Sequence, residues 1–141
     1  MSNAPTLESL LADSGLADKA QVLEQNLVRL QWGSAFVIVG VSGSAVVAIA
    51  PLFREVPRER ITDFYKKLLE HNAYMGGMAS FAIQSDGWVI LHAGRALKGI
   101  DANEFANLVA GVGRFADQFD DQLIHEFYVD QRESTNQADV Q

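Results

Sequence analysis

Two short stretches of this chain are apolar at every position, and they limit what the chain can become. One is Phe36-Val37-Ile38-Val39 and the other is Val46-Val47-Ala48-Ile49. Both are rich in β-branched residues, and a strand places successive side chains on opposite faces of its sheet. A single layer of helices covers only one face of a sheet. We therefore expect the second face to be buried by a partner or to form an exposed patch. The alternative is that loops and the last helix bury both faces.

The periodicity elsewhere predicts one α+β domain over 5–130, with helices on one face of an antiparallel sheet, followed by a polar tail over 131–141. The expected order is α-β-β-β-α-β-β-α. Residues 16–26 are ambiguous, and 17–24 fit a further helical turn or two. The expected elements are a helix over 6–14, strands over 28–32, 35–41 and 45–52, a helix from Pro57 to about His71-Asn72, strands over 79–84 and 88–93, and a long helix after Asp101.

The last helix has the clearest start signal in the chain. Asp101 and Glu104 fit the first and last positions of a capping box. Gly111 and Gly113 interrupt its apolar stripe, at a cost of about 1 kcal/mol each relative to alanine. We interpret both glycines as points of close packing, with local weakness as the alternative.

The charge distribution excludes several classes of partner. The formal net charge is −7, and residues 1–100 are balanced at nine acidic and nine basic side chains. The whole excess lies in 101–141, where it is typical of a solvated acidic helix face. Nucleic acid and anionic membranes both need a basic surface, so we expect neither as a partner.

Composition also bears on the compartment. No stretch approaches the roughly 18 apolar residues of a membrane helix, and residues 1–5 lack the features of a signal peptide. The chain has no cysteine, which excludes disulfides and thiol chemistry. A cytoplasmic location is the simplest expectation.

The polar residues do not form a recognisable catalytic or metal motif. His71, His92 and His125 lack metal-site spacing, so we expect no metal, no cofactor and no catalytic residues. A small-ligand or enzymatic pocket near Trp88 and His92 remains an alternative.

Three acidic residues near the middle of the last helix invite a second interpretation. Asp117, Asp120 and Asp121 could suggest a divalent cation site. No glycine-rich calcium loop accompanies them, so a solvated helix face is the favoured interpretation.

A family resemblance is carried by residues 61–127. Its motifs are Leu68-Leu69-Glu70-His71-Asn72-Ala73, the turn Met75-Gly76-Gly77, Phe81-Ala82-Ile83, the Asp86-Gly87 hairpin, Val89-Ile90-Leu91 and the link Leu97-Lys98-Gly99-Ile100-Asp101. With the helix order, small size and acidic pI, these resemble the type III secretion chaperone-like superfamily. That group includes the Tir-chaperone (CesT-like) family and YbjN-like regulators. Residues 1–60 agree with it only in expected layout.

The resemblance implies a dimeric, ATP-independent chaperone or adaptor that holds an extended segment of a partner protein. A YbjN-like regulatory or sensory binding protein is the alternative. Strand addition at a free sheet edge would supply main-chain hydrogen bonds to the partner. The homodimer contact maps to the middle helix, at Ile61, Phe64, Tyr65 and Leu68. The implied partner-binding residues are Leu7, Leu10, Leu11, Trp32, Phe36, Ile38, Val46 and Ile49.

Overall fold

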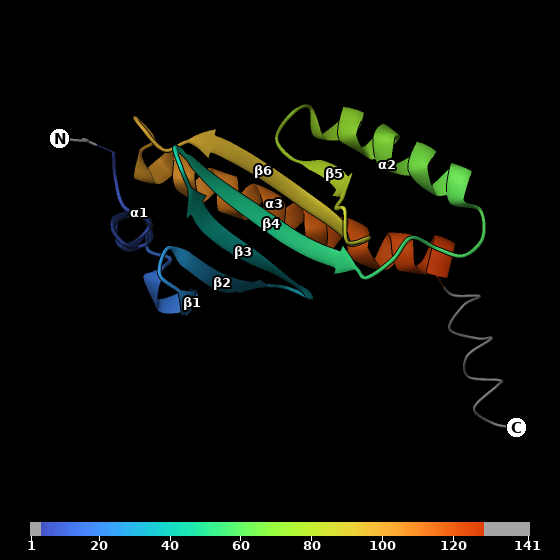
Figure 1. Cartoon of the computed structure of the whole chain (residues 1–141), viewed down its shortest axis with the longest axis horizontal. Coiled ribbons are helices and arrows are strands. Elements are labelled where there is room, and N and C mark those ends of the chain that lie inside the picture. The colour runs from blue at the N-terminus through green and yellow to red at the C-terminus, as the bar shows by residue number, and fades with distance from the viewer. Residues whose placement is uncertain (1–3, 129–141) are drawn as a thin grey trace, which may run out of the picture.

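The fold is built on one antiparallel sheet with a long helix along one of its faces (Figure 1). The computed structural model describes residues 4–128. The six strands are ordered β1-β2-β3-β4-β6-β5. The elements are α1 (Leu7–Ser14), η1 (Ala17–Lys19), β1 (Ala20–Glu24), β2 (Leu27–Trp32), β3 (Ala35–Ser42), β4 (Ala45–Phe53), α2 (Ile61–Met75), β5 (Ser80–Ile83), β6 (Val89–Ala96), α3 (Ala102–Leu123) and η2 (Ile124–Tyr128).

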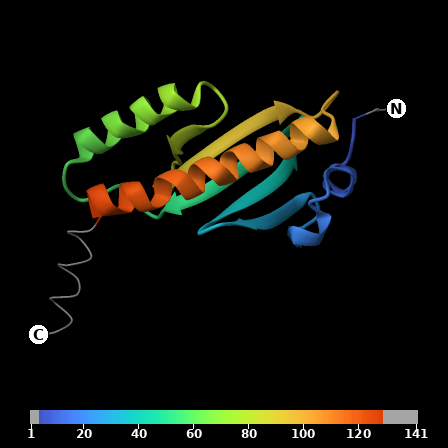
Figure 2. The ribbon, with the colours of Figure 1, turned by 180° about the vertical axis from the view of Figure 1, so that it is seen from behind.

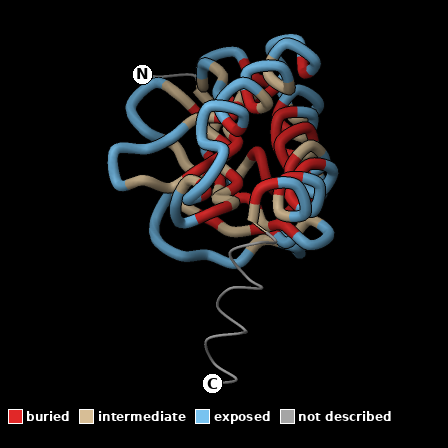
Figure 3. Tube along the Cα trace, turned by 90° about the vertical axis from the view of Figure 1, so that its right-hand side faces the viewer, coloured by how far each residue is buried: buried red, intermediate tan, exposed pale blue. Residues whose placement is uncertain are grey.

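Helix α3 crosses the sheet on one side, as the view from behind shows (Figure 2). Burial consequently alternates along the central strands. In β3, Val37 and Val39 face α3 and are fully buried, whereas Phe36 and Ile38 point the other way and are half-buried. The buried segments gather between the sheet and α3 (Figure 3). The expectation that one layer of helices leaves the second face uncovered is therefore confirmed.

The predicted α+β class and antiparallel meander are confirmed, with one additional strand. Residues 20–24, left ambiguous in the sequence, form β1 and pair with β2. The turn between β1 and β2 passes through Asn26, whose φ of 62° is one that asparagine tolerates better than most residues. The strand conformation of this segment comes from its pairing with β2, which the local sequence does not encode. The polar tail predicted over 131–141 lies outside the described residues.

The helix termini match the sequence signals unevenly. Thr6 caps α1 as expected, and Gly15 ends it in the left-handed conformation. Asp101 caps α3 by accepting a hydrogen bond from the Glu104 N–H at 2.8 Å. The prediction for α2 was wrong at both ends. This helix starts at Ile61, after Pro57, and runs on to Met75, where left-handed Gly76 stops it.

The two glycines of α3 behave differently. A Cβ on Gly113 would overlap the indole of Trp32, so the close-packing interpretation is confirmed at this position. A Cβ on Gly111 would meet nothing within 4 Å, so the same interpretation is wrong there. Glycine at 113 thus lets β2 approach the helix closely.

The acidic face of α3 is only partly solvated. Ser34, in the turn between β2 and β3, donates its N–H to Asp117 at 2.9 Å. The Ser34 hydroxyl lies 2.9 Å from Asp117 Oδ1 and 2.7 Å from Asp120 Oδ2. Asp120 is buried, against the expectation of a solvated face, because the turn covers it. These carboxylates hold the hairpin onto the helix.

Candidate partner-binding surfaces

No helix of residues 4–128 covers the side of the sheet opposite α3 (Figure 1). The side chains on this side of the central strands are mostly half-buried. Strand register places Arg29, Ile38, Ile49 and His92 next to one another across β2, β3, β4 and β6. Phe36, Val47 and Pro51, which lie two residues away from these along β3 and β4, are also half-buried and apolar. We call this surface the open face, and define it as Arg29, Phe36, Ile38, Val47, Ile49, Pro51 and His92.

The open face is apolar with a positive component. The Arg29 guanidinium lies 4.0 Å from the centroid of the Phe36 ring, in cation–π geometry. No acidic residue belongs to the open face, although the chain as a whole carries a net charge of −7. This surface therefore suits a segment with apolar side chains and an occasional carboxylate.

The sequence-predicted partner-binding residues fall into three groups. Phe36, Ile38 and Ile49 lie on the open face. Trp32 is half-buried and packs against α3 at Gly113. The other four are in the core, and this corrects the prediction that they form an accessible surface. Leu7, Leu10 and Leu11 of α1 are at most 6% exposed because they pack against α3, and Val46 is fully buried.

The residues of the predicted dimer contact on α2 include both exposed and buried side chains. Ile61 and Tyr65 are about 40% exposed and point outward, whereas Phe64 and Leu68 are buried. Leu69, which sequence reasoning did not select, is 67% exposed and extends the outward side of the helix. Its spacing of four residues from Tyr65 was the available signal. We call Ile61, Tyr65 and Leu69 the α2 stripe.

Aromatic contacts fasten α2 to the rest of the chain at two points. Near its start, Phe64 packs edge-on against Phe127, with ring centroids 5.2 Å apart. Near its end, His71 stacks on Phe119 at 4.2 Å. Burial lowers the pKa of His71, with a smaller contribution from Lys67, and this favours the neutral ring in the stack.

Tyr128, the last residue of η2, also packs against Phe64 of α2. Its hydroxyl donates a hydrogen bond of 2.7 Å to the Glu55 carbonyl. Burial raises the pKa of Tyr128, and the Glu55 charge raises it further. The phenol therefore remains a neutral donor at physiological pH.

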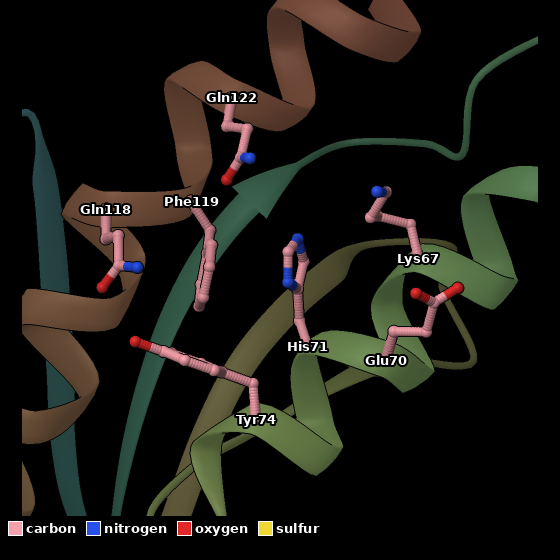
Figure 4. A pocket seen from close by; sticks show the side chains of 7 residues that line it. All are labelled: Lys67, Glu70, His71, Tyr74, Gln118, Phe119 and Gln122. Atoms are coloured by element: carbon pink, nitrogen blue, oxygen red, sulfur yellow. The ribbon is translucent and has the colours of Figure 1, made fainter.

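A cleft of about 400 Å³ lies between α2 and α3 (Figure 4). His71 and Tyr74 enter it from α2 and face Phe119 of α3. Its walls mix polar and aromatic groups and contain no serine, threonine or cysteine nucleophile beside His71. The lining residues are Lys67, Glu70, His71, Tyr74, Gln118, Phe119 and Gln122. Neither Trp88 nor His92, the alternative ligand site, lines this cleft.

The described residues bear on two further points. Between 4 and 128, no cluster of three or more His, Cys, Asp or Glu side chains could hold a metal ion. In the same range, no helix is both long enough and apolar enough to cross a membrane.

The edge strand β1 presents apolar side chains to solvent. Val22 is 73% exposed and Leu23 is 42% exposed, and a bulge interrupts the pairing with β2 between Val22 and Glu24. Because β1 is the first strand of the sheet order, its outer side has no neighbouring strand among residues 4–128. Such an edge can accept a further extended segment.

The same architecture occurs in proteins of known structure. No curated protein sequence matches the chain. Among solved structures, a chain of the ExsC–ExsE complex is 14% identical with a TM-score of 0.60, and the match covers 85% of this chain and 95% of that one. A chain of the Pseudomonas aeruginosa ExoU–SpcU complex of the type III secretion system is 16% identical with a TM-score of 0.61, and the match covers 80% of this chain and 93% of that one.

A third structure is the Yersinia pestis type III secretion chaperone SycH in complex with a stable fragment of YscM2. It gives 15% identity and a TM-score of 0.53, and the match covers 79% of this chain and 94% of that one. These likenesses confirm the secretion-chaperone-like fold. The sequence model of the Tir chaperone protein (CesT) family matches residues 6–118, which adds the first half of the chain to the region that carried the sequence resemblance. The chain belongs to the Tir chaperone protein (CesT) family.

Proposed function

We propose that this chain is a cytoplasmic, ATP-independent homodimeric chaperone that holds an extended apolar segment of a partner protein. The observation that carries the proposal is the open face, where apolar side chains stay half-exposed because α3 covers only the other side of the sheet. The burial of apolar surface is the main driving force in most protein–protein association. The family membership supports a non-catalytic role for this surface.

The partner segment would use two adjoining surfaces. Ile38 and Ile49 offer apolar contacts on the open face, and Arg29 offers a positive charge. The outer edge of β1 offers main-chain hydrogen bonds. One structure with a similar fold is the HopA1–SchA chaperone–effector complex, which supports a protein partner.

The homodimer contact would be the α2 stripe. Ile61, Tyr65 and Leu69 are exposed apolar side chains on one side of a helix, and self-association would remove them from water. Helix α2 lies at the β5 end of the sheet, whereas β1 is at the other end and the open face lies between them, on the side away from α3 (Figure 1). Dimer formation would therefore leave the partner surfaces accessible.

The test is co-expression with the proteins encoded beside this chain, followed by size-exclusion chromatography. Ile38→Glu places a carboxylate on the open face, and we expect it to abolish co-elution of the partner while the chain stays folded. Asn103→Glu, on the exposed side of α3, is the matched control and should leave the complex intact. A complex that forms equally well with Ile38→Glu would contradict the proposed use of the open face.

A further inference from the structure

The two edge strands of the sheet differ in whether a side chain bonds to their backbone. An edge strand directs alternate backbone N–H and C=O groups away from its neighbour, and these groups can recruit another strand. The edges here are β1 and β5. The side chain of Asn72 bonds to the backbone of β5, and none of the side-chain hydrogen bonds described for residues 4–128 reaches the backbone of β1.

At β5, the side-chain amide of Asn72 bonds both main-chain groups of one residue. Asn72 Oδ1 accepts a hydrogen bond from the Phe81 N–H at 2.7 Å, and Asn72 Nδ2 donates one to the Phe81 carbonyl at 3.4 Å. A carboxamide offers the same donor and acceptor as a peptide group. Asn72 therefore takes the place that a residue of a neighbouring strand would take.

The position of Phe81 makes this contact effective. In an antiparallel pair, residues that bond the neighbouring strand alternate with residues that face outward. The Gln84 N–H bonds the Trp88 carbonyl, so Gln84 faces β6, and the same alternation turns Phe81 outward. Strand β5 has only four residues, Ser80–Ile83, so blocking Phe81 removes about half of its outward-facing groups.

We propose that Asn72 closes the β5 edge against strand addition and leaves β1 as the edge where a partner strand can add. The inference rests on the proposed function for the identity of what adds at β1, but closure of β5 is a property of the chain alone. Once β5 is opened, its first occupant is β5 of a second copy, because identical short edges can pair antiparallel. Asn72 is thus a specificity-determining residue for where the sheet grows.

The experiment uses the absence of cysteine from the chain. Ile83→Cys places a single thiol at the end of β5, where the native side chain is 42% exposed. Oxidative cross-linking is followed on non-reducing gels in three backgrounds: wild type, Asn72→Ala, and Asn103→Ala as the control. We expect several-fold faster dimer cross-linking with Asn72→Ala, and no change with Asn103→Ala. Equal rates in all three backgrounds would overturn the proposal.

A second measurement does not depend on a variant that might fold poorly. Amide hydrogen exchange in the unmodified chain, resolved by residue, should show the Phe81 N–H exchanging many-fold more slowly than the Ser85 N–H in the exposed turn. If Phe81 exchanges as fast as Ser85, its N–H is open to solvent and Asn72 does not close the edge. Neither measurement needs the partner, so failure of the proposed function would appear separately, as absence of a complex on co-expression.

Discussion

At the scale of single residues, close contacts across elements decide which side chains are tolerated. Trp32 reaches α3 only because Gly113 has no side chain, whereas Gly111, two residues earlier, has open space around it. The sequence pattern gave the two glycines the same interpretation. Their environments differ because the indole comes from a strand about 80 residues away in the chain, which periodicity along the helix cannot reveal.

Alanine at these two positions should therefore act in opposite directions. Gly113→Ala forces a methyl group into the Trp32 ring, and overpacking of this kind costs about 1–3 kcal/mol. Gly111→Ala adds helix propensity without a clash, so it should raise the free energy of unfolding by up to about 1 kcal/mol. Urea denaturation of both variants measures the difference. Equal destabilisation would mean that the contact with Trp32 is not what requires glycine at 113.

At the scale of elements, local patterns located most strands but could not state what covers them. Alternation and short turns placed β2, β3 and β4 correctly, and the cap at Asp101 placed the start of α3. Strand β1 was missed because its pairing with β2 forms it. The leucines of α1 were assigned to a partner because an amphipathic stripe looks the same whether a partner or α3 covers it.

The contact between the β2–β3 turn and α3 gives a prediction for pH. Hydrogen bonds from the Ser34 N–H and hydroxyl lower the pKa of Asp117 below its ordinary value. A lowered pKa in the folded state contributes stability above the ordinary pKa near 3.8, and that contribution is lost as pH falls through the folded value. Asp117→Asn should therefore lose less stability than the wild type between neutral pH and pH about 3.

Thermal unfolding across that pH range, by circular dichroism, makes the comparison. Ser34→Ala is the matched variant, because it removes the hydroxyl but keeps the backbone N–H, which is the larger cause of the shift. It should retain more of the acid dependence than Asp117→Asn. Identical acid profiles for wild type and Asp117→Asn would show that this carboxylate is not linked to stability.

At the scale of the whole molecule, helix α2 has one side that packs on the rest of the chain and one side that is exposed. Tyr65 belongs to the α2 stripe and Phe64, its neighbour, is fully buried. Tyr65→Arg should therefore give a folded monomer if the α2 stripe forms the homodimer, because a charge in an apolar contact is costly. Phe64→Arg should instead destabilise the fold by roughly several kcal/mol, because it buries an unpaired charge.

Light scattering coupled to size exclusion, with the 15.4 kDa protomer as reference, measures the outcome at several concentrations. Circular dichroism separates loss of the dimer from loss of the fold. A Tyr65→Arg variant that remains dimeric at micromolar concentration would move the contact away from the α2 stripe. A Phe64→Arg variant that folds normally would contradict the packing of this ring against Phe127.

The placement of α2 at one end of the sheet and of β1 at the other has a consequence for avidity (Figure 1). In a dimer joined through the α2 stripe, each protomer would keep its own open face and β1 edge. One partner chain long enough to reach both would bind bivalently, with the second site at an effective concentration set by the intervening segment. Weak contacts at each protomer could then add up to a durable complex that still releases stepwise, one half at a time.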